Sequence, residues 1–251
     1  MNSRVLGLLG VVLALTSCTS PTPSQEVAKP EPIAGTQPSG MLNVAFLVVD
    51  GVYNSELVAP MDIFHHTVFH TPKDQGMGMR VFTVAPSLEP ITTFEGLRLL
   101  PDYAYTSDSV PAIDVLVVPS AENSMGTDLE NEEMISWVRT VGRQAQYVMS
   151  LCDGAFVLAQ AGLCEGREST TFPSDIARYR ETFPELTVHE GLSFVHDGPL
   201  ITSAGGALSY DPALYLCELL YGTRAAEGIG RGLVIDWNRN QVKHHVVTAT
   251  P

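Results

Sequence analysis

Basic residues are scarce in this sequence of 251 residues. Only 14 lysines and arginines stand against 28 aspartates and glutamates, which gives a net charge of −14 when the histidines are neutral. A surface this acidic repels phosphate backbones, so we expect no nucleic-acid partner. The sequence also contains neither an internal repeat nor a helix-turn-helix pattern, and its length suits one domain with a full core.

Cysteines are few as well, with four in the chain. They are too few and too irregularly spaced for a disulfide framework, and no CxxC pair occurs. The adjacent pairs His65-His66 and His244-His245 point in different directions on any helix or strand, so we interpret both as surface histidines. We therefore expect neither a metal site nor a cofactor.

A long apolar run is missing from the amino-terminal region. The run from Val5 to Leu15 is too short to span a bilayer as a permanent helix. It ends in Leu15-Thr16-Ser17-Cys18, which resembles the lipobox of bacterial lipoproteins. This resemblance implies that residues 1–17 are a lipoprotein signal peptide and that Cys18 carries the lipid. We then expect an exported protein that is lipid-anchored to a membrane of the bacterial cell envelope; an ordinary secretory signal with a chance cysteine is the alternative.

Residues 18–40 are rich in proline and poor in apolar side chains. Such a segment cannot bury enough apolar surface to offset the entropy of ordering. Its prolines favour extended structure, so we predict a disordered, semi-stiff tether. The folded domain is expected to occupy residues 41–251.

Strand and helix patterns alternate along this domain. Apolar runs rich in β-branched residues at 42–49 and 114–119 are typical of buried parallel strands. Further strands are predicted at 80–85 and 147–150, with helices at about 55–68, 132–143 and 209–221. The turn pairs Glu190-Gly191 and Asp197-Gly198 predict hairpins between short strands at 187–189, 192–195 and 200–202. The alternation predicts an α/β fold with a doubly wound parallel sheet, in which ligands bind at the carboxyl ends of the strands.

Cys152 lies at one of these strand ends. The strand at 147–150 precedes it, small residues follow it, and a helix starts near Phe156. This order is typical of a nucleophile elbow, in which a sharp turn presents a side chain above the sheet. The start of a helix also lowers a thiol pKa, so we expect a reactive thiolate. The alternative is a buried cysteine packed as a small apolar residue.

Other strand ends supply possible partners for this thiol. Glu56 follows the first strand and is a candidate acid/base group, although an acid at a helix start also has a purely structural explanation. The backbone amides of Asp153, Ser120 and Ala121 are candidate oxyanion donors. Asp211 either reaches the pocket or caps the last helix.

Several blocks of the chain resemble the DJ-1/PfpI superfamily of class I glutamine-amidotransferase-like proteins. They are residues 46–51 with 56–64, 114–119, 150–163, and 201–206 before Asp211. The nearest branch contains isonitrile hydratases and the amino-terminal domains of AraC-type regulators. The resemblance implies a flavodoxin-like three-layer α/β/α sandwich, a homodimer, Cys152 as nucleophile or redox centre, and Glu56 as its acidic partner.

The chain departs from the family pattern at three places. Ser120-Ala121 stands where the family often has two glycines, and Phe172-Pro173 stands where the related branch often has His-Trp. Asp153 replaces the histidine of protease-like members, which argues against a peptidase or deglycase site. The DNA-binding domain of the regulators is not expected here.

We therefore expect an enzyme with hydratase or hydrolase chemistry that acts on a small electrophile through Cys152. A non-catalytic lipoprotein that binds a small ligand or senses oxidants is the main alternative. A purely structural role for Cys152 is the third.

Overall fold

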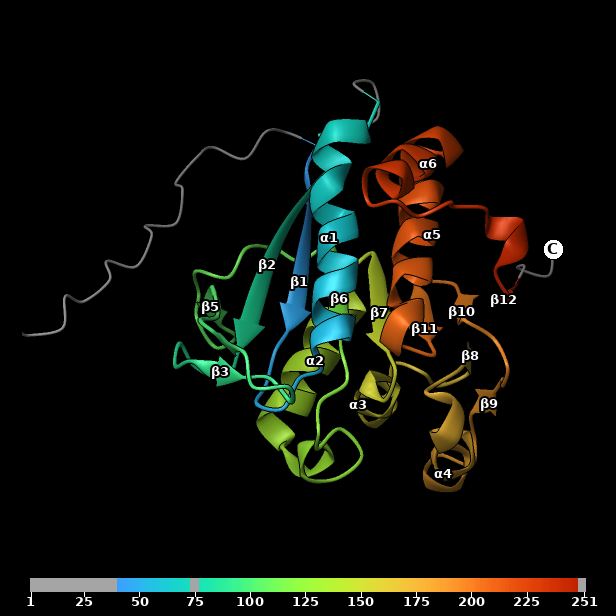
Figure 1. Ribbon diagram of the computed structural model, residues 1–251. Coiled ribbons are helices and arrows are strands. Elements are labelled where there is room, and N and C mark those ends of the chain that lie inside the picture. Colours follow the sequence, from blue (N-terminus) through green and yellow to red (C-terminus); the bar gives the residue numbers. More distant parts are fainter. Residues whose placement is uncertain (1–39, 73–76, 248–251) are drawn as a thin grey trace, which may run out of the picture. The chain divides into compact units, whose positions relative to one another are not determined.

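The computed structural model describes residues 40–72 and 77–247, and its main feature is an eight-stranded sheet (Figure 1). The strand order is β12-β10-β11-β7-β6-β1-β2-β5. Every neighbouring pair is parallel except β10 and β11. The strands are β1 (Leu42–Leu47), β2 (Met79–Ala85), β5 (Tyr103–Ala104), β6 (Val115–Val118), β7 (Tyr147–Leu151), β10 (Phe194–Asp197), β11 (Leu200–Ser203) and β12 (His244–Val246).

Helices cover both faces of this sheet. On one face, α1 (Asn54–His70), α5 (Tyr210–Tyr221) and α6 (Thr223–Gly232) pack over a core that includes Phe46 and Leu214. On the other face, α2 (Glu132–Gln144) and α3 (Gly154–Gln160) pack over the sheet in a core cluster that joins Val138 of α2 and Leu158 of α3 to Leu116 of β6. A third cluster joins α3 to α4 (Ile176–Thr182) through Phe156 and Tyr179. The predicted three-layer α/β/α sandwich is therefore confirmed.

The central strands owe their position to their composition. All four residues of β6 are buried, and three of them are valines, which fit a pleated surface covered on both sides. Val44 of β1 pairs with Val115 of β6 in parallel register. This arrangement brings the carboxyl ends of β1, β6 and β7 to one edge of the sheet, where the predicted site residues follow.

One of the two predicted hairpins is wrong. The turn at Asp197-Gly198 does join two antiparallel strands, β10 and β11. The strand before Glu190-Gly191, β9 (Thr187–Val188), pairs instead in parallel with β8 (Glu168–Ser169) in a separate small sheet. The amide of His189 donates to the carbonyl of Ser169 and so continues this ladder, which directs the chain away from a hairpin.

Short elements complete the fold. β3 (Ile91–Thr92) and β4 (Arg98–Leu99) form a second small sheet, which is antiparallel. The 3-10 helices are Thr127–Glu130, Pro173–Asp175, Gly206–Ser209 and Arg239–Gln241. The segment after α6 adds β12 alongside β10 at the edge of the main sheet.

The predicted signal peptide at residues 1–17 and the lipidation residue Cys18 lie outside the described residues, as does the linker up to residue 39. These boundaries and that of the domain at 41–251 stay predictions. In the described part of the chain, no helix combines the length and the apolar character needed to cross a membrane.

Candidate functional site around Cys152

Cys152 occupies a strained turn between β7 and α3. Its φ is 54°, in the left-handed region that a residue with a side chain rarely adopts, at a cost of roughly 1–3 kcal/mol. The turn is tight because Gly154 lies against β6: a Cβ on Gly154 would be 2.0 Å from the carbonyl oxygen of Val118. The fold thus accepts strain to place this side chain, and only 6 % of the residue is exposed.

A second strand end holds Cys152 from the other side. The Cys152 amide donates to the carbonyl of Ser203 at the end of β11, over 3.0 Å. Gly205, two residues further on, has a φ of 73°, and a Cβ there would be 2.3 Å from the Cβ of Cys152. A glycine is therefore required beside the cysteine for both backbone conformation and space.

Glu56 lies close enough to Cys152 for each group to shift the pKa of the other. It sits in the first turn of α1, where the helix dipole favours a carboxylate, and is 4 % exposed. Its Oε2 accepts from the Ser120 amide at 3.0 Å and its Oε1 from the Gly206 amide at 3.2 Å. Three strand ends thus fix one carboxyl group against the thiol.

The pKa values of these two groups are both raised. Burial raises the pKa of Glu56 to about 7, against the lowering effect of its hydrogen bonds to Gly206, Cys152 and Ser120. Burial, followed by the negative charges of Glu56 and Asp153, also raises the pKa of Cys152. The expectation of a lowered thiol pKa is therefore corrected. The Asp153 amide does favour the thiolate, as a helix start should, but burial outweighs it.

Asp153 supplies a second buried carboxyl group next to the thiol. Its Oδ1 lies 3.0 Å from the hydroxyl of Thr171, and its Oδ2 lies 3.7 Å from the Cys152 sulfur. Burial raises the pKa of Asp153 to about 6, and the hydrogen bond from Thr171 opposes this rise. The Thr171 hydroxyl is also 3.1 Å from the Cys152 carbonyl oxygen.

Two of the three predicted oxyanion donors already have partners. The Ser120 amide donates to Glu56, and the Ala121 amide donates to the Ser124 hydroxyl at 2.8 Å. The Asp153 amide faces the sulfur of Cys152. The amides of the loop after β6 therefore hold Glu56 and the loop itself, and of the three predicted donors only the Asp153 amide acts on the thiol.

Tyr53 and Thr171 belong to this site although sequence reasoning did not include them. Tyr53 is the N-cap residue of α1, and its ring lies 4.6 Å from that of Phe94. Burial, then the charges of Cys152 and Glu56, raise the pKa of Tyr53. The sequence signal that could have placed Tyr53 in the site is its position three residues before Glu56, about one helical turn away.

Asp211 lies in the first turn of α5 and contacts a different partner. Its Oδ2 accepts from the Ser193 hydroxyl at 2.6 Å, which ties α5 to the segment before β10. Burial raises its pKa. This contact gives Asp211 a structural function at the start of α5.

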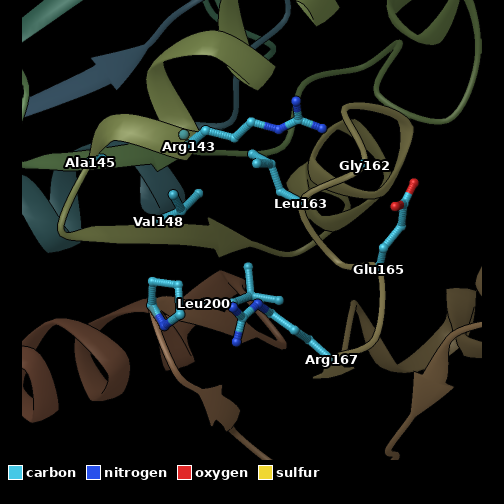
Figure 2. A pocket seen from close by; sticks show the side chains of 10 residues that line it. Arg143, Ala145, Val148, Gly162, Leu163, Glu165, Arg167 and Leu200 are labelled. Carbon is cyan, nitrogen blue, oxygen red and sulfur yellow. The ribbon is translucent and has the colours of Figure 1, made fainter.

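A separate pocket of about 330 Å³ lies at the opposite edge of the sheet (Figure 2). It opens beside Val148 and Leu200, near the starts of β7 and β11. Figure 2 shows Arg143 and Arg167 on its two sides. Because Val148 and Cys152 are four residues apart along an extended chain, roughly 13 Å separate this pocket from the thiol. The pocket is therefore distinct from the candidate site.

Comparison with known proteins agrees with the fold. The model of the DJ-1/PfpI family matches residues 42–218. The chain belongs to the DJ-1/PfpI family. This match includes Glu56, both site loops and the Cys152 elbow.

Two similar proteins represent the two kinds of protein in the branch that the sequence resembles. Isonitrile hydratase of Pseudomonas putida is 30% identical over 187 residues, which cover 74% of this chain and 75% of that protein. The HTH-type transcriptional regulator CdhR of Pseudomonas aeruginosa is 34% identical over 111 residues, which cover 44% of this chain and 33% of the regulator. The similarity thus reaches both enzymes and regulators.

Solved structures share the same fold at low identity. The crystal structure of Drosophila melanogaster DJ-1beta has a TM-score of 0.65 and 20% identity, and the match covers 78% of this chain and all of that one. An AraC family transcriptional regulator from Pseudomonas putida gives a TM-score of 0.66 and 19% identity, with 76% and 99% coverage.

Proposed function

We propose that this protein is a cysteine-dependent hydratase or hydrolase for a small electrophile, with Cys152 as nucleophile and Glu56 as general base and acid. One observation carries the proposal. The Glu56 carboxyl group is fixed by two backbone amides beside Cys152, interacts electrostatically with its thiol, and has a pKa raised to about 7. A general base works best when its pKa lies near the working pH, which is the condition met here.

The raised pKa of Cys152 favours a concerted mechanism. A standing thiolate is disfavoured by burial and by the charge of Glu56, so the proton leaves as the sulfur attacks. Glu56 accepts this proton and then returns it to the substrate. The Asp153 amide lies beside the sulfur and stabilises negative charge there during the transfer.

An isonitrile is the substrate that the similarity to the Pseudomonas putida hydratase favours. The sulfur bonds to the terminal carbon of the isonitrile while the thiol proton passes through Glu56 to that carbon, which gives a thioimidate. Water adds across the carbon–nitrogen double bond, with its hydroxyl on carbon and its proton on nitrogen. The carbon–sulfur bond then breaks, the hydroxyl proton returns to the sulfur, and an N-substituted formamide leaves.

Turnover of a panel of small isonitriles, aldehydes and amides tests this proposal. The wild-type chain should convert at least one class, and Cys152→Ser should convert none. Glu56→Gln should keep the thiol but lose at least about a hundredfold in rate, the usual contribution of a general base. Equal rates in wild type and Cys152→Ser would contradict the proposal.

The similarity to a transcriptional regulator favours a second candidate function, which is redox sensing or ligand binding. Oxidation of a cysteine to sulfenic acid follows its thiolate character and exposure. A buried thiol with a raised pKa is poorly suited to this. Reversible oxidation of Cys152 by micromolar peroxide, with no turnover of the panel, would favour the sensor instead.

We further propose that the protein is exported and lipid-anchored through Cys18, and that it forms a homodimer. The lipobox-like residues 15–18 support the anchor. Wild type should fractionate with membranes and Cys18→Ser should not, whereas a membrane-bound Cys18→Ser protein would contradict the anchor. Sedimentation in detergent should give twice the chain mass, and a monomer at micromolar concentration would contradict the dimer.

A further inference from the structure

Three side chains that are far apart in the sequence converge on the surface near β10. Glu168 belongs to β8, His189 follows β9 directly, and His245 is the middle residue of β12. The Nε2 of His189 lies 2.5 Å from Oε2 of Glu168, and the Nε2 of His245 lies 3.1 Å from the same oxygen. One atom from each of the three residues falls within 4.8 Å of the other two.

The backbone holds each member of this His-Glu-His cluster in place. The His189 amide and carbonyl bond to Ser169 and to the Thr170 hydroxyl, so this residue is fixed on both sides. His245 pairs in register with Val195 of β10. The Glu168 amide donates to Asp197 at 2.9 Å. Rigid strands therefore position the three side chains, which lowers the entropy cost of binding a ligand between them.

Two imidazoles and one carboxylate form a donor set with a specific chemistry. Imidazole nitrogen and carboxylate oxygen together suit divalent first-row transition metals, and a His₂Glu set binds catalytic zinc in other folds. With bonds of about 2.0–2.1 Å in a tetrahedron, donor atoms lie roughly 3.3 Å apart. The observed separations of 2.5 and 3.1 Å need only small side-chain movements to reach this value.

Exposure leaves room for an ion and a further ligand. About a third of each side chain is accessible, with 31% for His189 and Glu168 and 40% for His245. An ion can thus enter from solvent, and a water molecule can complete a four-coordinate shell. The acidic character of the chain also favours a cation over an anion at this surface.

We propose that Glu168, His189 and His245 bind one divalent transition-metal ion of the Zn²⁺ class through a carboxylate oxygen and two Nε2 atoms. The alternative is an ion pair that forms only when the histidines are protonated and that has no affinity for metal. The two differ in whether the cluster binds Zn²⁺.

Calorimetric titration of the full chain in detergent with Zn²⁺ at pH 7.5 tests the proposal. Cys152→Ser serves as the background, so that the elbow thiol does not compete for metal. We expect one equivalent of Zn²⁺ to bind at micromolar concentration. His189→Gln, His245→Gln and Glu168→Gln should each weaken binding by at least about tenfold, since loss of even an outer-shell partner costs this much.

His244→Gln is the matched control. His244 is adjacent to His245 in β12, but its ring stacks on Phe194 with centroids 5.0 Å apart and does not belong to the cluster. The affinity of the His244→Gln variant for Zn²⁺ should stay within about twofold of that of the background protein. Circular dichroism separates loss of metal from loss of fold, and Co²⁺ absorption in the visible range reports the coordination directly. No binding by the background protein, equal affinity in the double variant of His189 and His245, or equal weakening by His244→Gln would overturn the proposal.

Discussion

Gly205 lies so close to Cys152 that a Cβ on the glycine would be 2.3 Å from the Cβ of the cysteine. Both residues have positive φ values, 73° and 54°. The turn after β11 therefore packs directly against the elbow after β7, and neither can change without moving the other. The position of the thiol depends on a residue that carries no functional group.

Replacing Gly205 by alanine should destabilise the fold and displace the thiol. The new methyl group meets Cys152, and alanine at this φ is strained, so we expect a loss of at least about 2 kcal/mol in the free energy of unfolding. The alkylation rate of Cys152 should also change. Denaturant unfolding and iodoacetamide labelling measure the two effects.

Gly206→Ala separates crowding from backbone strain. Gly206 has a φ of 56°, and a Cβ there meets nothing within 4 Å. Its replacement should therefore cost only the strain, about 1–2 kcal/mol, and leave Cys152 labelling unchanged. Equal effects of the two substitutions would show that contact with Cys152 does not matter.

The pH dependence of stability should report the raised pKa of Glu56. Its folded-state pKa of about 7 lies above its ordinary value of 4.5, so its contribution to stability is fully present below pH 4.5 and is lost as the pH rises through 7. The full change corresponds to about 3 kcal/mol. Glu56→Gln should remove this dependence on pH. The stability of the variant relative to wild type should therefore increase as the pH is raised from 5 to 8. Urea unfolding of both proteins at pH 5 and pH 8 measures these free energies. If the difference in free energy of unfolding between Glu56→Gln and wild type is the same at the two pH values, the raised pKa is contradicted.

The reactivity of Cys152 should also respond to Glu56. Above pH 7 the ionised carboxylate raises the pKa of the thiol, so a neutral glutamine should lower that pKa. Alkylation of Glu56→Gln at pH 8 should therefore be faster than that of wild type, while catalytic turnover falls. Labelling that is indifferent to Glu56 would contradict the contact between the two side chains and with it the proposed general base.

Thr171→Val should perturb the second carboxyl group of the site. Loss of the hydroxyl leaves Asp153 with a buried oxygen that lacks its donor, at a cost of roughly 1–3 kcal/mol. Because this hydrogen bond lowers the pKa of Asp153, the substitution should raise it above about 6. Thr171→Ser keeps the hydroxyl and should behave like wild type. Unfolding measurements and carboxyl titration by NMR distinguish the two variants.

The sandwich and the elbow could be predicted because their signals are local. Buried parallel strands such as β6 show as runs of β-branched residues, and the Cys152 turn shows as an apolar run followed by small residues. The partner of β9 could not be predicted. Parallel pairing of Glu168 with Thr187 depends on distant residues, and the nearby Glu190-Gly191 turn favoured a hairpin instead.

The chemistry of the site was less predictable than its position. A helix start predicts a lowered thiol pKa, but burial, which depends on the packing of β11 and α1 around Cys152, reverses the direction. The hydrogen bond that Glu56 accepts from the Ser120 amide likewise joins residues 64 positions apart, so local sequence could not indicate it. Interpretation of His245 as one member of an adjacent surface pair missed the two partners that β8 and β9 bring beside it.

β12 gives the end of the described chain a protective function. An uncovered edge strand offers unpaired amides and carbonyls to other protein molecules. β12 covers the outer side of β10 over the register from Phe194 to His196. Removal of the segment after α6 would leave β10 open to strand pairing between molecules, so truncated versions of this protein should aggregate even though the Cys152 elbow is untouched.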